Sequence, residues 1–166
     1  MSRKKILSEL KSTLDSAKSK LDALDPKSKD IYIHCTGGWA RCYLDGLHSM
    51  GLRPKAYLDN DRSKQGKIFD GVDVIAPEDV ADKSNALVLI CSLEATVNQA
   101  VSRKLDRLDL PHLNIDGYIF SLYSTEIMHC AETFDDDESV SVYSKMIDIR
   151  MAPENTWVNN GNTGGG

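Results

Sequence analysis

The chain has 166 residues and a formal net charge of −5 at pH 7, and this length suits one domain with a buried core. The negative charge excludes general nucleic-acid binding, which needs a cationic surface. The longest apolar run, residues 86–91, falls far below the roughly 18 residues that span a membrane. The basic residues at 1–5 lead into a charged helical pattern instead of an apolar signal segment. We therefore expect a cytoplasmic protein with no membrane span and no nucleic-acid partner.

The cysteines lie far apart in the sequence and form no Cys-x-x-Cys pair. Zinc ligands and disulfide frameworks have characteristic short spacings, which this chain lacks. We interpret the cysteines as small core residues, and we predict no metal site. They are Cys35, Cys42, Cys91 and Cys130.

An amphipathic helix is predicted over residues 2–24, within an N-terminal unit of residues 1–29. Its apolar residues recur at spacings of three and four, and Pro26 ends the pattern. This stripe packs either on its own domain or on a partner helix. It consists of Ile6, Leu10, Leu14, Ala17, Leu21 and Leu24.

Short β-branched runs then alternate with helical patterns over residues 30–116. Helices are predicted at 39–50 and 94–108, a helical turn at 77–80 and a polar surface loop at 62–71. This alternation predicts a Rossmann-like α/β fold, an open parallel sheet of about five strands with helices on both faces. The predicted strands are 30–35, 55–58, 72–75, 85–91 and 111–115.

The pattern changes after residue 116. One helix is predicted over 117–133 and another up to Met151, so that 117–152 forms a C-terminal helical pair. The acidic run 135–138 precedes the last helix; it could attract a cation, but we favour a helix cap. The Gly- and Asn-rich segment 153–166 is predicted to be a flexible tail or linker.

The turn after the first strand carries the strongest functional signal. The dinucleotide-binding spacing G-x-G-x-x-G/A falls on Cys35, Gly37 and Ala40, so the first glycine is replaced and the second is kept. In such a turn, backbone N–H groups at a helix N-terminus approach a phosphate. The turn is therefore either a site for a phosphorylated ligand or a decayed loop that only shapes the fold. The candidate residues here are Thr36, Gly37, Gly38, Trp39, Ala40 and Arg41.

Two further segments complete the candidate site. Asp59, followed by Asn60, ends the second predicted strand 22 residues beyond Gly37, where a carboxylate can accept hydrogen bonds from ribose; acidic turns after strands are also common. Cys91 and Ser92 follow the most apolar strand and are expected to form the far wall of the same crevice. For Ser92, a helix N-cap is the favoured alternative.

No catalytic machinery is evident from the residue pattern. The histidines are scattered, and His34 and Tyr32, the nearest proton donors, lie on a buried strand. Trp39 could stack on a base, but we favour an inward orientation toward the sheet. Its predicted inward-facing neighbours on the helix are Ala40, Tyr43, Leu44 and Leu47.

Two stretches resemble a known family. The first runs from Tyr32 through Val80 and on to the strand ALVLICS; it contains the glycine loop, the LDN turn and a GK-x-x-x-G-x-x-V-x-x-P-E segment. It resembles the small Rossmann-like domain that precedes the catalytic domain in FkbM-family methyltransferases. It is also similar to the sugar-nucleotide-binding N-terminal domain of hexapeptide-repeat acyltransferases. The second stretch, from Phe134 through Tyr143 to Arg150, resembles the helix before the FkbM methyltransferase core.

This resemblance implies a non-catalytic accessory domain of a glycan- or polysaccharide-modifying methyltransferase. The ligand would be a nucleotide-sugar or another phosphorylated molecule, and S-adenosylmethionine would belong to a separate methyltransferase domain in cis or in trans. Two alternatives remain open. One is an interaction or homo-oligomerisation module with a vestigial pocket, and the other is a small nucleotide-dependent enzyme.

Overall fold

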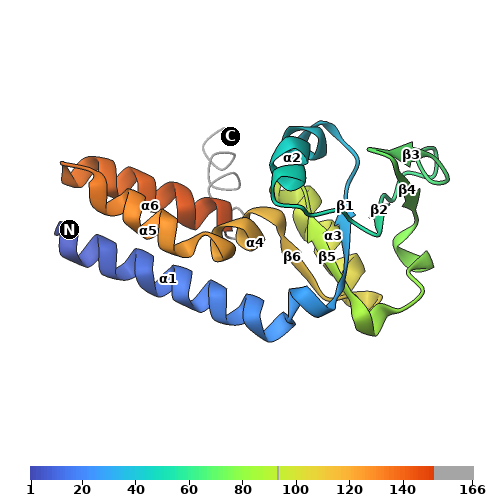
Figure 1. The fold of residues 1–166 in the computed structure, drawn as a ribbon, viewed down its shortest axis with the longest axis horizontal. Helices are drawn as coiled ribbons and strands as arrows, with labels where there is room; N and C mark the ends of the chain where they lie inside the picture. The colour runs from blue at the N-terminus through green and yellow to red at the C-terminus, as the bar shows by residue number, and fades with distance from the viewer. Residues whose placement is uncertain (93, 152–166) are drawn as a thin grey trace, which may run out of the picture.

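A computed structural model describes residues 1–92 and 94–151 of the chain. It is a mixed α/β fold in which one sheet is joined to a bundle of helices (Figure 1). The strands are β1 (Asp30–His34), β2 (Ala56–Leu58), β3 (Ile68–Phe69), β4 (Val72–Ile75), β5 (Ala86–Ile90) and β6 (His112–Asn114). The α-helices are α1 (Arg3–Leu24), α2 (Gly38–Ser49), α3 (Ala95–Arg107), α4 (Ile115–Leu122), α5 (Ser124–Thr133) and α6 (Asp137–Met151).

The sheet has the strand order β3-β4-β2-β1-β5-β6. All of its neighbouring strands are parallel except the antiparallel pair β3–β4. The chain moves outward from β1 to β2 and β4, and then returns to the other side of β1 to form β5 and β6. The strand order therefore reverses between β1 and β5, which is the place where open α/β sheets bind ligands.

Helices cover both faces of the sheet, as predicted. On one face, Ala40 and Leu47 of α2 pack with Ile33 and Leu89 of the central strands. On the other face, the apolar side of α3 packs against the strand residues that point the opposite way along the same strands. The alternation of side chains along each strand thus divides the core into two layers.

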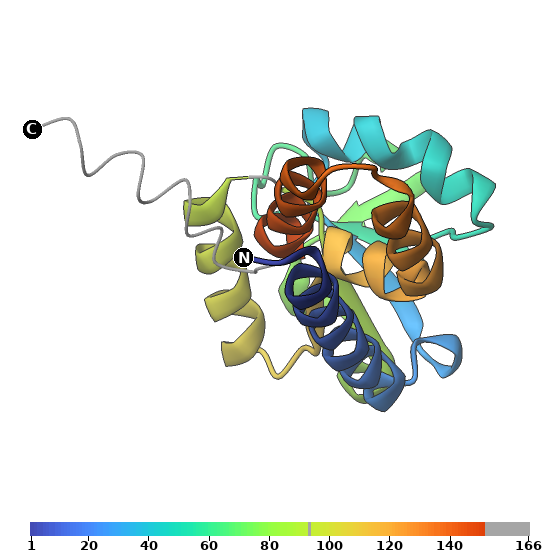
Figure 2. The same cartoon turned by 90° about the vertical axis from the view of Figure 1, so that its left-hand side faces the viewer.

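The terminal helices form a third layer beside the sheet. Leu10 and Leu14 of α1 are fully buried against Ile127 of α5 and Ile147 of α6. Figures 1 and 2 show α1, α5 and α6 running side by side, with α4 joining them to the sheet. The apolar stripe of α1 is therefore covered by helices of the same chain.

Two elements differ from the sequence prediction. The predicted loop 62–71 contains the short strand β3, which pairs with β4 through a turn at Asp70 and Gly71, both with positive φ (50° and 73°). The helix predicted over 117–133 is two helices, because the backbone leaves helical geometry at Tyr123 (φ −104°, ψ 27°). Within residues 1–92 and 94–151, no helix combines the length and the apolarity that crossing a membrane requires. The predicted tail 153–166 lies outside the described residues.

Candidate functional site

The predicted site residues come from three loops at the carboxyl ends of β1, β2 and β5. We call this part of the sheet the carboxyl edge. Residues 35–37 link β1 to α2, Asp59 and Asn60 follow β2, and Cys91 and Ser92 follow β5. Because β1 lies between β2 and β5 in the sheet, the fold brings these loops together around the point where the strand order reverses.

The first turn of α2 has free backbone donors. Gly37 is the N-cap and supplies no side-chain hydrogen bond. The N–H groups of Gly38, Trp39 and Ala40 open the helix, where no preceding turn offers a carbonyl partner. The positive end of the helix dipole adds to this arrangement, which suits an anion.

Nothing in the described part of the chain requires glycine at Gly37 or Gly38. Gly37 has φ −82° and ψ −172°, an extended conformation open to any residue. A Cβ atom added at either glycine would meet no other atom within 4 Å. As far as residues 1–92 and 94–151 are concerned, the space above the turn is therefore open, and the backbone can be approached closely from outside.

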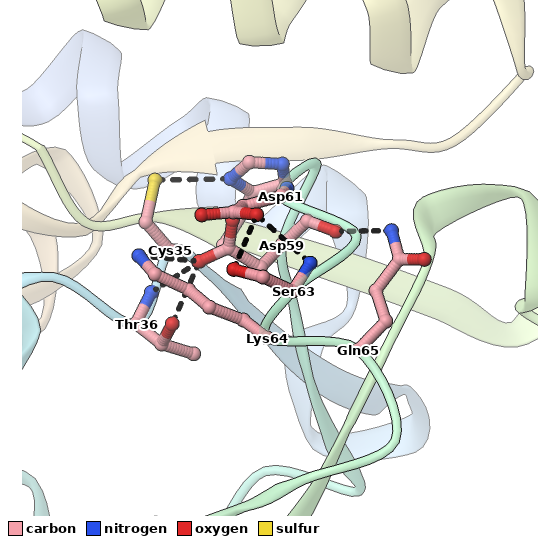
Figure 3. Close-up of polar contacts among 8 residues, drawn as sticks. Cys35, Thr36, Asp59, Asp61, Ser63, Lys64 and Gln65 are labelled. Atoms are coloured by element: carbon pink, nitrogen blue, oxygen red, sulfur yellow. Dashed lines mark hydrogen bonds and ion pairs between the residues drawn. The ribbon is translucent and has the colours of Figure 1, made fainter.

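Asp59 ties the β1–α2 loop to the loop after β2 (Figure 3). Its Oδ2 accepts hydrogen bonds from the backbone N–H of Thr36 at 3.2 Å and from the Thr36 hydroxyl at 2.6 Å. Its Oδ1 accepts the N–H of Asp61 at 2.9 Å, and Lys64 Nζ lies 3.4 Å from Oδ2. Asp59 thus lies beside the β1–α2 loop, and these contacts within the protein already engage its carboxylate.

The same contacts determine the ionisation of Asp59. Burial opposes ionisation, but the hydrogen bonds from Thr36 and Asp61 and the charge of Lys64 outweigh it and lower the pKa. Asp59 is therefore a fixed anion under the loop. Because the N–H of Thr36 points at Asp59, a phosphate could use the amides that follow it but not this one.

The prediction that the Trp39 side chain points inward, toward the sheet, is wrong. Its side chain is exposed (47%), whereas the neighbouring Ala40 is buried (2%). The helix begins at Gly38, so Trp39 is in its first turn, beside the open loop. Arg41 is also exposed, and its guanidinium lies over the ring of Phe69 in β3, 5.1 Å from the centroid.

The loop after β5 also differs from the sequence prediction. Glu94, not Ser92, is the N-cap of α3, and the Ser92 hydroxyl instead accepts the N–H of Glu94 at 3.2 Å. Burial raises the pKa of Cys91 to about 12 and that of Cys35 to about 11, so neither thiol is a nucleophile at neutral pH. Asn60, the remaining predicted residue, accepts a hydrogen bond from Lys104 Nζ at 2.7 Å.

His34 ends β1 directly beneath the loop. It is 2% exposed, its Nδ1 lies 3.0 Å from Cys35 Sγ, and its Nε2 has no hydrogen-bond partner in the described part of the chain. Burial lowers its pKa to about 4, against the opposing charge of Asp59. His34 is therefore neutral at physiological pH, and a buried polar atom without a partner destabilises the fold.

Comparison with known proteins gives one structural likeness. No protein-family model matches the chain, and no curated protein matches it. A solved structure that shares its fold is the methyltransferase FkbM from Methylobacillus flagellatus KT, with a TM-score of 0.50 and 13% sequence identity over 87% of this chain. The chain has an FkbM-like fold. It spans about half (49%) of that methyltransferase.

A cavity lies elsewhere in the molecule. It measures about 680 Å³ and is lined by residues of α1, β5, α3, β6, α4 and α6, and none of the ten predicted site residues lines it. We call it the lateral cavity. Nothing in the sequence pattern pointed to it, because its walls combine residues of six elements, from Ser12 of α1 to Met151 of α6.

The acidic run after α5 acts as a helix cap, as favoured from the sequence. Asp136 accepts the backbone N–H of Ser139 at 2.7 Å and the Ser139 hydroxyl at the same distance. Across residues 1–92 and 94–151, no cluster of three or more His, Cys, Asp or Glu side chains could hold a metal ion.

Proposed function

We propose that this chain is a non-catalytic, Rossmann-like ligand-binding domain of an FkbM-type, glycan- or polysaccharide-modifying methyltransferase system in the cytoplasm. It binds a nucleotide-sugar or another phosphorylated nucleotide at the N-terminus of α2. The pyrophosphate accepts hydrogen bonds from the amides that follow Thr36, and the exposed indole of Trp39 stacks on the base.

The observation that carries this proposal is the open turn at Gly37 and Gly38. Within the described residues, neither glycine is needed for backbone conformation or packing. Glycine at these positions would instead allow a ligand to approach the backbone closely. The turn also lies at the reversal of strand order, where this class of sheet binds ligands. The Thr36–Asp59 anchor holds the loop in place without using the amides of the first helical turn.

The chemistry of the surrounding residues favours binding without catalysis. The thiols of Cys35 and Cys91 are held protonated, and His34 is buried and neutral. A nucleophile needs an adjacent base or a lowered pKa, and a hydride-transfer enzyme needs an accessible proton donor. The methyl-transfer step, with its S-adenosylmethionine, is assigned to a separate methyltransferase domain, in cis or in trans.

Thermal unfolding in the presence of candidate ligands tests the proposal. UDP-glucose, NAD⁺ and coenzyme A carry a pyrophosphate, whereas S-adenosylmethionine carries none. A ligand that binds only the folded chain stabilises it by about 2.7 kcal/mol at a hundredfold excess over its Kd. We expect at least one pyrophosphate compound to raise the unfolding temperature and S-adenosylmethionine to leave it unchanged.

A pair of matched glycine variants makes the test specific. Gly37→Ala places a methyl group where the phosphate would lie, and we expect it to fold normally but to lose the ligand-induced shift. Gly46→Ala adds the same methyl group in the exposed middle of α2, again with no atom within 4 Å. It should be stabilised by roughly 0.5–1 kcal/mol and keep full binding. Equal ligand shifts in the two variants would contradict the proposed site.

A second candidate function, homo-oligomerisation, is favoured by exposed side chains on α6. Val142 and Met146 are 55% and 56% exposed, one turn apart on that helix, whereas the stripe of α1 is covered within the chain. Light scattering over a range of concentrations tests this candidate. A dimer that a Val142→Lys substitution dissociates would support it, and a monomer at every concentration would exclude it.

A further inference from the structure

The lateral cavity has the dimensions of a small-molecule site. At about 680 Å³ it falls within the roughly 300–1,000 Å³ typical of ligand pockets. It lies between the sheet and the helical layer, lined by residues of β5, β6 and α3 and by residues of α1, α4 and α6. The proposed phosphate site at α2 is not part of the lateral cavity, so the cavity would bind a different ligand.

The hydroxyl group of Ser102, in the cavity lining, already donates its hydrogen to a group of the protein. His112 Nδ1 lies 2.9 Å from the carbonyl oxygen of Leu110. A carbonyl only accepts, so this nitrogen carries the proton in the neutral imidazole. Nε2 is then an acceptor, and the Ser102 hydroxyl donates to it at 2.7 Å. With His112 in this tautomer, whose Nε2 also lies 3.8 Å from Asp106 Oδ1, the Ser102 oxygen is left to accept a hydrogen bond from a ligand.

Two more lining residues have the same bias. The Ser121 hydroxyl donates to the carbonyl of Gly117 at 2.6 Å and is left as an acceptor. Asn98 is 3% exposed; its Nδ2 donates to the carbonyl of Ser92 at 3.0 Å, while its Oδ1 has no partner in the part of the chain that is described. The acceptor oxygens of Ser102, Ser121 and Asn98 therefore suit a ligand that donates hydrogen bonds.

The charged residues that line the cavity indicate where a cationic group of such a ligand would bind. Asp148 of α6 lines it beside Thr13 of α1. Asp148 is an exposed residue, but its partial desolvation and the neighbouring charge of Glu9 raise its pKa, so a cation close to this carboxylate is favoured. Lys20 also lines the cavity, but it follows Thr13 by seven residues on α1, or about 10 Å at 1.5 Å per residue.

The apolar part of the lining is aliphatic. Ala17, Ile90, Leu113 and Met151 line it, and no Phe, Tyr or Trp is among its described lining residues. Nucleobases are usually held by stacking on aromatic rings, and this surface offers none. A compact aliphatic frame suits it better.

We propose that the lateral cavity binds a small protonated aliphatic amine. The ammonium group pairs with Asp148, and its remaining hydrogens are donated to the acceptor oxygens described above. The carbon chain contacts the aliphatic lining residues. This site is independent of the nucleotide site proposed at α2.

Ligand titrations followed by amide NMR spectra test the proposal on the full chain. The probes are n-butylamine and putrescine, with n-butanol as an uncharged control and succinate as an anionic control. The amines should shift amide signals of α1, α3 and α6 in a saturable manner. Butanol should bind at least about tenfold more weakly, and succinate should leave these signals in place. Equal effects of butylamine and butanol, or amine-induced shifts outside these helices, would overturn the proposal.

A charge-neutral variant gives the second readout. Asp148→Asn removes the charge with little change in shape, and because Asp148 is on the surface side of α6 the fold should be kept. Amine affinity should fall at least about tenfold, the equivalent of one lost charge-assisted hydrogen bond. Asp15→Asn removes an exposed acid of α1 that is not in the cavity wall and should leave affinity unchanged. Unchanged binding in Asp148→Asn would refute the site.

The two proposals fail separately. Asp148→Asn should not alter the response to UDP-glucose, NAD⁺ or coenzyme A, and Gly37→Ala should not alter amine binding. Loss of nucleotide binding alone would remove the proposed function and leave the lateral cavity as an amine site.

Discussion

The carboxylate of Asp59, at the end of β2, accepts both the backbone N–H and the hydroxyl of Thr36, at 3.2 Å and 2.6 Å. Two loops that are 23 residues apart are thereby joined through one buried oxygen. The anchor fixes where α2 begins, because Thr36 is the residue before its N-cap. The position of the free amides of that helix thus depends on a side chain from another strand.

Replacing Thr36 by Val should weaken this anchor. The variant loses the hydroxyl donor, and with it a charge-assisted hydrogen bond whose removal costs about 2 kcal/mol. The free energy of unfolding in urea should fall by that amount, while Thr36→Ser should restore most of it. Thr125→Val, at an exposed position of α5, is the control and should change stability by less than about 0.5 kcal/mol.

Stability should fall on mild acidification because of His34. Its pKa is lowered from 6.5 to about 4 in the folded chain, so below pH 6.5 the unfolded chain takes up a proton that the folded chain resists. The resulting loss grows as pH falls from about 6.5 to about 4 and amounts to roughly 3 kcal/mol in full. Urea unfolding at pH values across this window measures it.

The matched comparison uses two histidine-to-glutamine variants. His34→Gln should flatten the pH dependence over this window, whatever its own effect on stability at neutral pH. His129→Gln, at an exposed position of α5, should leave the slope unchanged. Parallel slopes for wild type and His34→Gln would show that His34 does not titrate as its burial implies.

Arg150 holds the helical layer to the sheet layer. Its Nε lies 2.6 Å from Asp116 Oδ2 and its guanidinium donates to the Tyr43 hydroxyl at 2.9 Å, while Tyr43 also donates to Asp116. Arg150→Met leaves the buried Asp116 carboxylate without its cation; because Arg150 is itself 39% exposed, we expect a loss of about 2 kcal/mol.

A double-mutant cycle with Asp116→Asn checks this pairing. The two substitutions together should cost clearly less than the sum of the single ones, since each removes the same interaction. Lys145→Met at an exposed position of α6 should be nearly neutral. Strict additivity would mean that Arg150 and Asp116 do not depend on each other.

The N-terminal helix is predicted to be part of the folding unit. Leu14 is fully buried in the contact of α1 with α5 and α6, so Leu14→Ala should lower the unfolding free energy by about 3 kcal/mol. Val142→Ala, at an exposed position of α6, should change it by less than about 0.5 kcal/mol. A neutral Leu14→Ala would instead indicate that α1 serves as a detachable arm.

The sheet could be predicted because its strands are short apolar runs between turn residues. The strand β3 was missed although its signal was present: Asp70-Gly71 is a hairpin turn pair between Ile68-Phe69 and the next strand. The polar residues around it concealed so short a strand. The break at Tyr123 had no such signal, because neither glycine nor proline marks it.

The candidate site was predictable as a set of loops but not in its contacts. Strand order brings Asp59 close to Thr36, yet sequence spacing alone could not show that the protein itself would use that carboxylate. The exposure of Trp39 follows from the point at which α2 starts, which the periodicity of apolar residues leaves uncertain by a residue or more. The lateral cavity depends on how two layers of helices pack and leaves no local pattern.

The most direct test of the central claim is an amide NMR titration of the full chain with UDP-glucose, with uridine as the control that lacks phosphate. If the first turn of α2 holds the pyrophosphate, the backbone signals of Gly37, Gly38 and Trp39 and the Trp39 indole signal will shift and saturate, and uridine will move the backbone signals far less. If those signals stay in place while UDP-glucose is bound, or if UDP-glucose, NAD⁺ and coenzyme A all leave them unchanged, the helix does not hold a phosphoryl group and the account is wrong.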